Sequence, residues 1–232
     1  MLRASDYNLH PQLAWKYQPF PAPSIAANVV FLERAGSFRW VLFDDKFTWE
    51  TSDPTQGSWE RRDYGSDEAT PTSGTGHAMT RLGYDRALLF GGMDRQLHAC
   101  EGTHVYDWDR GWMLATYSTK NDPPLRAFAA LAALPNRTAV LFGGYDPATS
   151  DVLSDTWLFT FVGGDEMGRG TWTHVDTRAP AVAPSARAFH GLVGGRMTPG
   201  GPEIALLFGG SANSQLTPPT CDNDLWLFDP AK

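Results

Sequence analysis

The residues of this chain best suited to metal or nucleophilic chemistry are its six histidines and two cysteines. His77 and His190 occupy matching places, each opening a short segment that follows a proline-containing stretch. As zinc or iron ligands they need a third partner, typically a carboxylate, a histidine or a cysteine, and no His-x-His or His-x-x-Glu-His pattern is present. The sequence therefore favours matched structural histidines over a metal site, and it predicts neither a metal nor another cofactor.

The two cysteines, Cys100 and Cys221, also occupy matching places, each just ahead of a predicted strand. Two cysteines are too few for a disulfide framework, and a bond between them needs Cα atoms within about 7 Å. Free thiols are the favoured interpretation and a disulfide is the alternative. The chain has neither a P-loop motif nor a Gly-x-Ser-x-Gly nucleophile elbow, so no catalytic residue is predicted.

The charge pattern argues against several classes of partner. The formal net charge is −7, and lysines and arginines are scattered rather than gathered into the basic stripe typical of nucleic-acid binding. Binding to nucleic acid or to an anionic membrane is therefore disfavoured. Residues 1–10 contain no apolar run, and no stretch approaches the length of a membrane helix. We expect a cytoplasmic protein.

An internal repeat positions these residues. Short apolar runs ending in Phe-Gly-Gly occupy residues 87–92, 140–144 and 205–210, and a degenerate copy at 40–45 ends in Asp-Asp. A short, uninterrupted apolar run predicts a strand buried on both faces. The paired glycines permit positive φ and a close approach of another backbone.

Three further strands accompany each run. An inner strand precedes it, an alternating segment follows it after a polar loop, and a segment opening on tryptophan comes last. The predicted inner strands are 25–32, 77–81, 128–134 and 190–193. The alternating segments are 47–50, 103–107, 154–159 and 223–229, and the last strands open at Trp59, Trp112 and Trp172.

Units of about 50 residues that combine a double-glycine turn with a tryptophan in the fourth strand resemble the kelch repeat. The resemblance extends from about Trp15 to Asp229. It implies an all-β fold, a kelch-type β-propeller whose blades each have four antiparallel strands. We expect one domain over residues 1–232, with blades at approximately 20–65, 70–118, 124–177 and 184–230.

The order of the strands suggests how the ring closes. A tryptophan-type strand at 13–18 precedes the first blade, and the sequence ends after a third strand. Pairing the two would complete four blades and remove an exposed edge. Because kelch propellers are usually larger, the alternative is a segment of a bigger ring, or a chain that builds one with another chain.

The resemblance implies a non-catalytic protein–protein interaction scaffold or a subunit of a larger assembly. Its partners are expected on the loops between the second and third strands, at 93–102, 145–154 and 211–223. The predicted partner-binding residues are Arg126, Arg187, Asp94, Arg95, Tyr145, Asp146 and Asn213.

Arg126 and Arg187 each stand just before an inner strand. A guanidinium there can hold a partner's carboxylate with two hydrogen bonds. The equally weighted alternative is a structural role, capping the strand or pairing with Asp146 or Asp155. The long 194–202 segment offers a second docking site at the opposite face of the ring.

The alternative function is a small-molecule enzyme or binder that uses the central channel. Some kelch-like proteins are copper-radical oxidases, sugar mutarotases or iron-dependent specifier proteins. A copper oxidase needs tyrosine, histidine and a cross-linked cysteine together, and no local arrangement in this sequence supports that.

Overall fold

The computed structural model describes residues 28–44, 46–56, 58–64, 69–72, 74–116, 121–162, 169–176, 183–196, 198–212 and 221–231. These residues form four antiparallel sheets, each ordered as in the sequence, which we number as blades 1 to 4. Blade 1 contains β1 (Asn28–Arg34), β2 (Ser37–Phe43), β3 (Thr48–Thr51) and β4 (Glu60–Arg62), with a short 3-10 turn at Pro54–Gln56. Blade 2 contains β5 (Ala78–Arg81), β6 (Arg86–Phe90), β7 (Thr103–Asp107) and β8 (Gly111–Thr116). Blade 3 contains β9 (Ala130–Leu134), β10 (Thr138–Asp146), β11 (Asp151–Phe161) and β12 (Gly170–Val175), and blade 4 contains β13 (Gly191–Arg196), β14 (Glu203–Phe208) and β15 (Leu225–Phe228).

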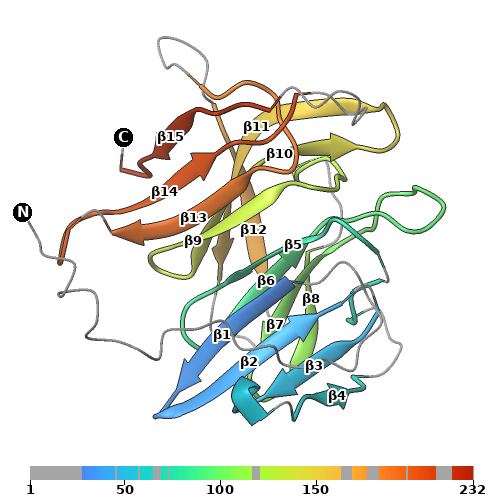
Figure 1. Cartoon of the computed structure of the whole chain (residues 1–232), viewed down its shortest axis with the longest axis vertical. Helices are drawn as coiled ribbons and strands as arrows, with labels where there is room; N and C mark the ends of the chain where they lie inside the picture. The colour runs from blue at the N-terminus through green and yellow to red at the C-terminus, as the bar shows by residue number, and fades with distance from the viewer. Residues whose placement is uncertain are drawn as a thin grey trace, which may run out of the picture.

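The first strand of every blade faces a common axis (Figure 1). Together β1, β5, β9 and β13 line one central cavity of about 370 Å³, walled mainly by valine, leucine, alanine and methionine. This arrangement confirms the predicted all-β propeller, built here from four blades of three or four strands. No helix in the described part of the chain has the length and apolar character needed to span a membrane.

The two ends of each blade differ in the connections they carry. The turn end carries the tight connections between the first and second strands, such as the one around Tyr84. The loop end carries the connections between the second and third strands, and there isolated bridges join Thr75 to Met93 and Ala127 to Tyr145. In blades 2 and 3, the residues just before the inner strand are thereby fixed to the long loop of the same blade.

The double glycines connect one blade to the next. Gly91 and Gly92 have φ of +73° and +102°, and the N–H of Gly92 donates to the carbonyl of Arg126 in blade 3 at 2.9 Å. The N–H of Gly144 donates to the carbonyl of Arg187 in blade 4 at the same distance. A Cβ at Gly91 would lie 2.3 Å from the Arg126 carbonyl oxygen, so the close approach predicted for these glycines is present.

Blade 1, which lacks the glycine pair, uses a carboxylate at this turn. Asp44 is buried, and its side chain accepts hydrogen bonds from the N–H groups of Lys46 and Phe47 and from the indole of Trp49. In blade 1, hydrogen bonds inside one loop thus take the place of the contact that the double glycines of blades 2 and 3 make with the next blade.

Aromatic contacts fill the seams between blades 1 and 2 and between blades 2 and 3. Phe43 at the end of β2 lies 5.5 Å from Trp112 of blade 2, and Phe90 at the end of β6 lies 5.2 Å from Trp172 of blade 3. Each indole also donates to a threonine of the preceding blade, Trp112 to Thr48 at 2.7 Å and Trp172 to Thr103 at 2.9 Å. The tryptophans predicted in the fourth strands therefore bind one blade to the one before it.

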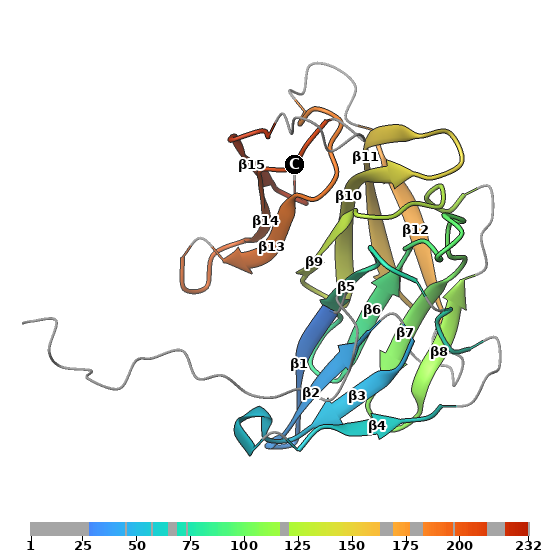
Figure 2. The ribbon, with the colours of Figure 1, turned by 45° about the vertical axis from the view of Figure 1, so that its right-hand side comes forward.

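Blades 4 and 1 lie at the two ends of the series (Figure 2). Successive inner strands pack against each other from β1 to β13, whereas β13 and β1 lack comparable contact. Among the described residues, no strand pairs with β15 on its outer side. The strand predicted at 13–18 to occupy that edge lies outside the described residues.

Candidate functional site

The inner strands of blades 2, 3 and 4 begin close together at the loop end of the channel. The N–H of Phe128 donates to the carbonyl of Gly76 at 2.6 Å, and the N–H of Phe189 donates to the carbonyl of Phe128 at 3.0 Å. These bonds join three blades through consecutive backbone contacts. We call residues 75–77, 127–129 and 188–190 the axial mouth.

Two phenylalanines whose rings contact each other occupy the axial mouth. The rings of Phe128 and Phe189 lie 4.3 Å apart between centroids, and Phe189 remains 47% exposed. Both residues have positive φ, +57° and +60°, which is rare for a bulky side chain and costs on the order of 1–3 kcal/mol. Gly76, the equivalent residue of blade 2, leaves room for the Phe128 ring, since a Cβ there would meet it at 2.7 Å.

The loops beside the axial mouth are stabilised by aspartates. The carboxylate of Asp94 accepts the N–H groups of Gln96 and His98, both at 2.8 Å, and that of Asp146 accepts the N–H of Ala148 at 2.8 Å. The bond from His98 is the main reason that the pKa of Asp94 lies below its usual value. Both aspartates thus shape their own loops.

The other predicted partner-binding residues of these loops lie at the same end. Arg95 is exposed at the tip of the blade 2 loop, next to Leu97, which is also exposed. Tyr145 is half-buried at the end of β10, and its hydroxyl donates to Ser150 at 3.3 Å. Asn213 lies outside the described residues.

Arg126 and Arg187 are completely buried. Arg126 binds both carboxylate oxygens of Asp155, at 2.5 and 2.8 Å, and donates to the carbonyl of Gly143 at 3.0 Å. Arg187 binds Asp224 at 2.5 and 2.9 Å and the carbonyl of Gly209 at 3.0 Å. Blades 3 and 4 therefore repeat one clasp, in which the arginine joins the double-glycine turn to an aspartate within β11 in blade 3 and directly before β15 in blade 4.

The same aspartates bind tryptophan. The indole of Trp157 donates to Asp155 and that of Trp226 to Asp224, each at 2.6 Å. Burial by itself raises the pKa of Asp155, but the hydrogen bonds and charge of Arg126, together with the indole, hold that pKa below its usual value. Hydrogen bonds from Arg187 hold the pKa of Asp224 far below its usual value.

These contacts bear on the hypothesis that Arg126 and Arg187 touch a partner, which stays a prediction. Their guanidinium groups are buried inside the blades, and carboxylates of the same blade bind them. The contacts fit the alternative of a structural role, with Asp155 as the partner of Arg126 and with Asp224, rather than Asp146, as the partner of Arg187.

His77 and His190 are seam residues in this structure. Both are buried, and each packs edge-on against the phenylalanine of the preceding blade: His77 lies 5.1 Å from Phe43 and His190 lies 5.5 Å from Phe142. Burial and the nearby charge of Arg187 lower the pKa of His190 to about 4. Within the described ranges, no group of three histidine, cysteine, aspartate or glutamate side chains could hold a metal ion.

Neither Cys100 nor Cys221 forms a disulfide; Cys100 is buried and Cys221 is exposed. Burial raises the pKa of the Cys100 thiol.

Sequence reasoning missed the paired phenylalanines Phe128 and Phe189. The available signal was the repeated Arg-Ala-Phe at 126–128 and 187–189, directly ahead of two inner strands. The prediction rested on the arginine of this motif, whereas the phenylalanine is the residue that reaches the mouth.

Comparison with known protein families supports the repeat assignment. The model of the KLHDC2/KLHL20/DRC7 Kelch-repeats domain matches residues 42–232. A search of curated proteins found no match. The family match covers most of the chain and includes all four Phe-Gly-Gly or Phe-Asp-Asp turns, so this chain belongs to the kelch-repeat family.

Proposed function

We propose that this chain is a non-catalytic, cytoplasmic protein-interaction module, acting as a scaffold or as a subunit of an assembly. Its partner docks at the axial mouth, with Phe128 and Phe189 as the anchor. Kelch propellers generally mediate protein–protein interactions and are typically non-enzymatic. Neither Cys100 nor Cys221 forms a disulfide, which suits a reducing compartment.

The observation that carries the proposal is the aromatic pair with positive φ, in which Phe128 is half-buried and Phe189 is exposed. A phenylalanine with positive φ persists only where the surrounding structure enforces it, and such residues cluster at functional sites. Here the enforcing contacts are the backbone bonds from Gly76 to Phe189. The contact between the two rings also gives an anchor of defined shape with little side-chain entropy left to lose on binding.

The character of the anchor decides the class of partner. Because Asp155 and Asp224 already neutralise the two arginines, the centre of the mouth offers apolar contact rather than an ionic clasp. The rim is polar, with Arg95, Tyr145 and the aspartate-capped loops around it. An apolar centre with a polar rim is the usual anatomy of a protein-docking site, and we infer a partner segment that inserts an apolar or aromatic side chain.

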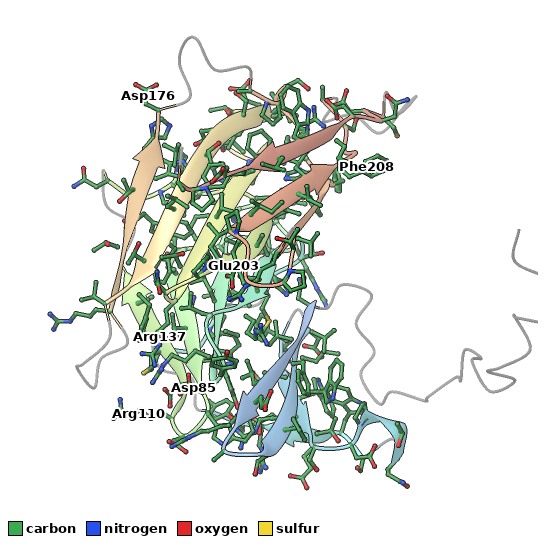
Figure 3. All side chains as sticks on the ribbon, turned by 90° about the vertical axis from the view of Figure 1, so that its left-hand side faces the viewer. Asp85, Arg110, Arg137, Asp176, Glu203 and Phe208 are labelled. Carbon is green, nitrogen blue, oxygen red and sulfur yellow. The ribbon has the colours of Figure 1, made fainter. Side chains whose placement is uncertain are left out.

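The test uses Phe189→Gly, which removes the ring and places the residue best suited to the observed φ of +60° at that position. The matched control is Tyr84→Gly, which removes an exposed aromatic ring in a turn at the opposite end; Figure 3 labels Asp85 and Arg137 in the turns there. Partners should be captured by affinity purification with mass spectrometry from the native cell.

We expect Phe189→Gly to lose the partners that the unaltered chain and Tyr84→Gly retain, with affinity reduced by about 2 kcal/mol or more, as for other interface anchors. Retention by Phe189→Gly combined with loss by Tyr84→Gly would move the site to the turn end. Capture that neither change affects would contradict docking through either aromatic residue.

A further inference from the structure

The series of blades ends on uncovered apolar surface at both sides. On blade 4, Val193, Phe208, Leu225 and Leu227 are between 47% and 66% exposed. On blade 1, Val29 and Phe38 are about half exposed, and Phe31 packs between Phe38 and Trp40 at 5.5 and 5.1 Å. We call these surfaces the blade 4 face and the blade 1 face.

The blade 4 face presents the phenylalanine that, in the internal seams, is covered by the following blade. Phe208 precedes a Gly-Gly pair, as Phe90 and Phe142 do, and is thus equivalent to them. Phe90 and Phe142 are 3% and 4% exposed because the next blade covers them, whereas Phe208 is 58% exposed. Figure 3 shows Phe208 at the end of β14, on the side turned away from blade 3.

The blade 4 face is also hollowed to receive a side chain. Val193, Ile204, Leu206 and Leu227 line a small, almost wholly apolar cavity of about 170 Å³. Its size suits one large apolar side chain.

The blade 1 face presents the tryptophan that, in the internal seams, covers the phenylalanine of the preceding blade. Trp59 directly precedes β4, in the place that Trp112 and Trp172 take at the start of the fourth strands of blades 2 and 3. Those two tryptophans cover Phe43 and Phe90 of the preceding blade. In the described part of the chain, no blade precedes blade 1.

At both faces, a residue that is polar or small in the internal seams is replaced by a larger apolar one. Leu225 stands opposite Phe208, where Thr48 and Thr103 stand opposite Phe43 and Phe90. Trp40 stands where blades 2, 3 and 4 have Ala87, Ala139 and Ala205, all of them fully buried. Each replacement enlarges the apolar surface, so exposure of these faces to water is costlier than for a copy of an internal blade.

We propose that copies of this chain associate head to tail, the blade 4 face of one copy packing on the blade 1 face of a second copy. The two complementary halves of a seam lie at opposite ends of the series, and β13 and β1 of one chain lack the contact that joins the other inner strands. A second copy supplies what each face lacks. Such a heterologous contact either closes into a ring or continues as a chain.

The test is sedimentation velocity at tens of micromolar protein on three full-length variants. Phe208→Glu alters the blade 4 face and Phe38→Glu alters the blade 1 face; both side chains are about half exposed, so the fold should tolerate the change. Tyr84→Glu places the same charge at an exposed tyrosine outside both faces. Circular dichroism verifies folding of all three.

The unaltered chain and Tyr84→Glu should self-associate, and each of the other two variants should do so at least about tenfold more weakly. An equimolar mixture of Phe208→Glu and Phe38→Glu should regain a two-chain species, because one intact blade 4 face then meets one intact blade 1 face. The proposal would be overturned if the unaltered chain were monomeric. It would also be overturned if Phe38→Glu by itself associated as strongly as the unaltered chain, or if the mixture stayed monomeric. Phe189 belongs to neither face, so this result is independent of partner docking.

Discussion

At the scale of single residues, burial decides which side chains are available for binding. Arg126 has the chemistry to hold a partner's carboxylate, yet it is used inside blade 3 to hold Asp155. A buried ion pair of this kind is costly to break, because removal of one member leaves an uncompensated charge in the interior. Phe189, which has no polar group, is the side chain left exposed at the same end of the molecule.

His190 makes stability depend on pH. Its pKa is lowered to about 4 in the folded protein, whereas an unfolded chain has a histidine pKa of about 6.5. The unfolded state therefore binds a proton first as pH falls, and the free energy of unfolding decreases below about pH 6.5 until the folded pKa is reached. The loss should be about 2 kcal/mol by pH 5.

The measurement is urea unfolding at pH 7 and pH 5 for the unaltered chain and for His190→Gln. The variant should be less stable at pH 7 but should lose much less stability between the two pH values. His98, which is exposed beside Asp94, offers the control His98→Gln. Equal pH dependence in the unaltered chain and His190→Gln would show that His190 is not the responsible group.

At the scale of elements, the apolar runs and the strand-four tryptophans were sufficient to predict the strands. The apolar runs were predicted at 87–92 and 140–144; residues 87–90 lie in β6 and residues 140–144 in β10. The arginine clasp was harder to predict, because the aspartates that complete it lie 29 and 37 positions away in sequence. The repeated Arg-Ala-Phe marked the two phenylalanines, but their positive φ could not be predicted, because positive φ at an aromatic residue has no local sequence signature.

The close packing of the double-glycine turns against the next blade predicts that two glycine substitutions differ sharply in their effect on stability. Gly91→Ala places a Cβ 2.3 Å from the carbonyl oxygen of Arg126 at a residue with φ of +73°. The backbone of blade 3 would have to move, and the free energy of unfolding should fall by about 2–4 kcal/mol. Gly195→Ala, at a strand position with open space around it, should change it by no more than about 0.5 kcal/mol. Chemical denaturation of both variants compares them, and equal effects would contradict a steric role for Gly91.

At the scale of the whole molecule, the unpaired edge of β15 is the feature that most needs protection from aggregation. Blades 1 to 3 each have a fourth strand in the described part of the chain, and blade 4 has three. An unpaired strand edge is a template for aggregation. Residues 13–18, with Trp15, are our proposed fourth strand for this blade.

Deletion of residues 1–18 therefore tests whether this segment pairs with the edge of β15. The truncated chain should aggregate or melt at a much lower temperature, since it loses a strand and a large aromatic side chain worth about 3–5 kcal/mol when buried. Deletion of residues 1–10 keeps Trp15 and should melt close to the unaltered chain. Differential scanning calorimetry with light scattering measures both, and an unchanged melting temperature after removal of 1–18 would mean that another segment protects β15.

The hydrogen bonds from the double glycines to the arginine carbonyls join each turn to a residue that comes later in the sequence. This order matters during synthesis of the chain. The turn of blade 2 is completed only by Arg126, and the turn of blade 3 only by Arg187, both of which leave the ribosome after the blade they complete. Blades 2 and 3 thus emerge with an unfinished turn and wait for the start of the next blade, at synthesis rates of about 5–20 residues per second. A pause in translation after β8 but before Arg126, or after β12 but before Arg187, would hold a blade in its incomplete state, and codon choice in these two stretches should affect the yield of folded protein.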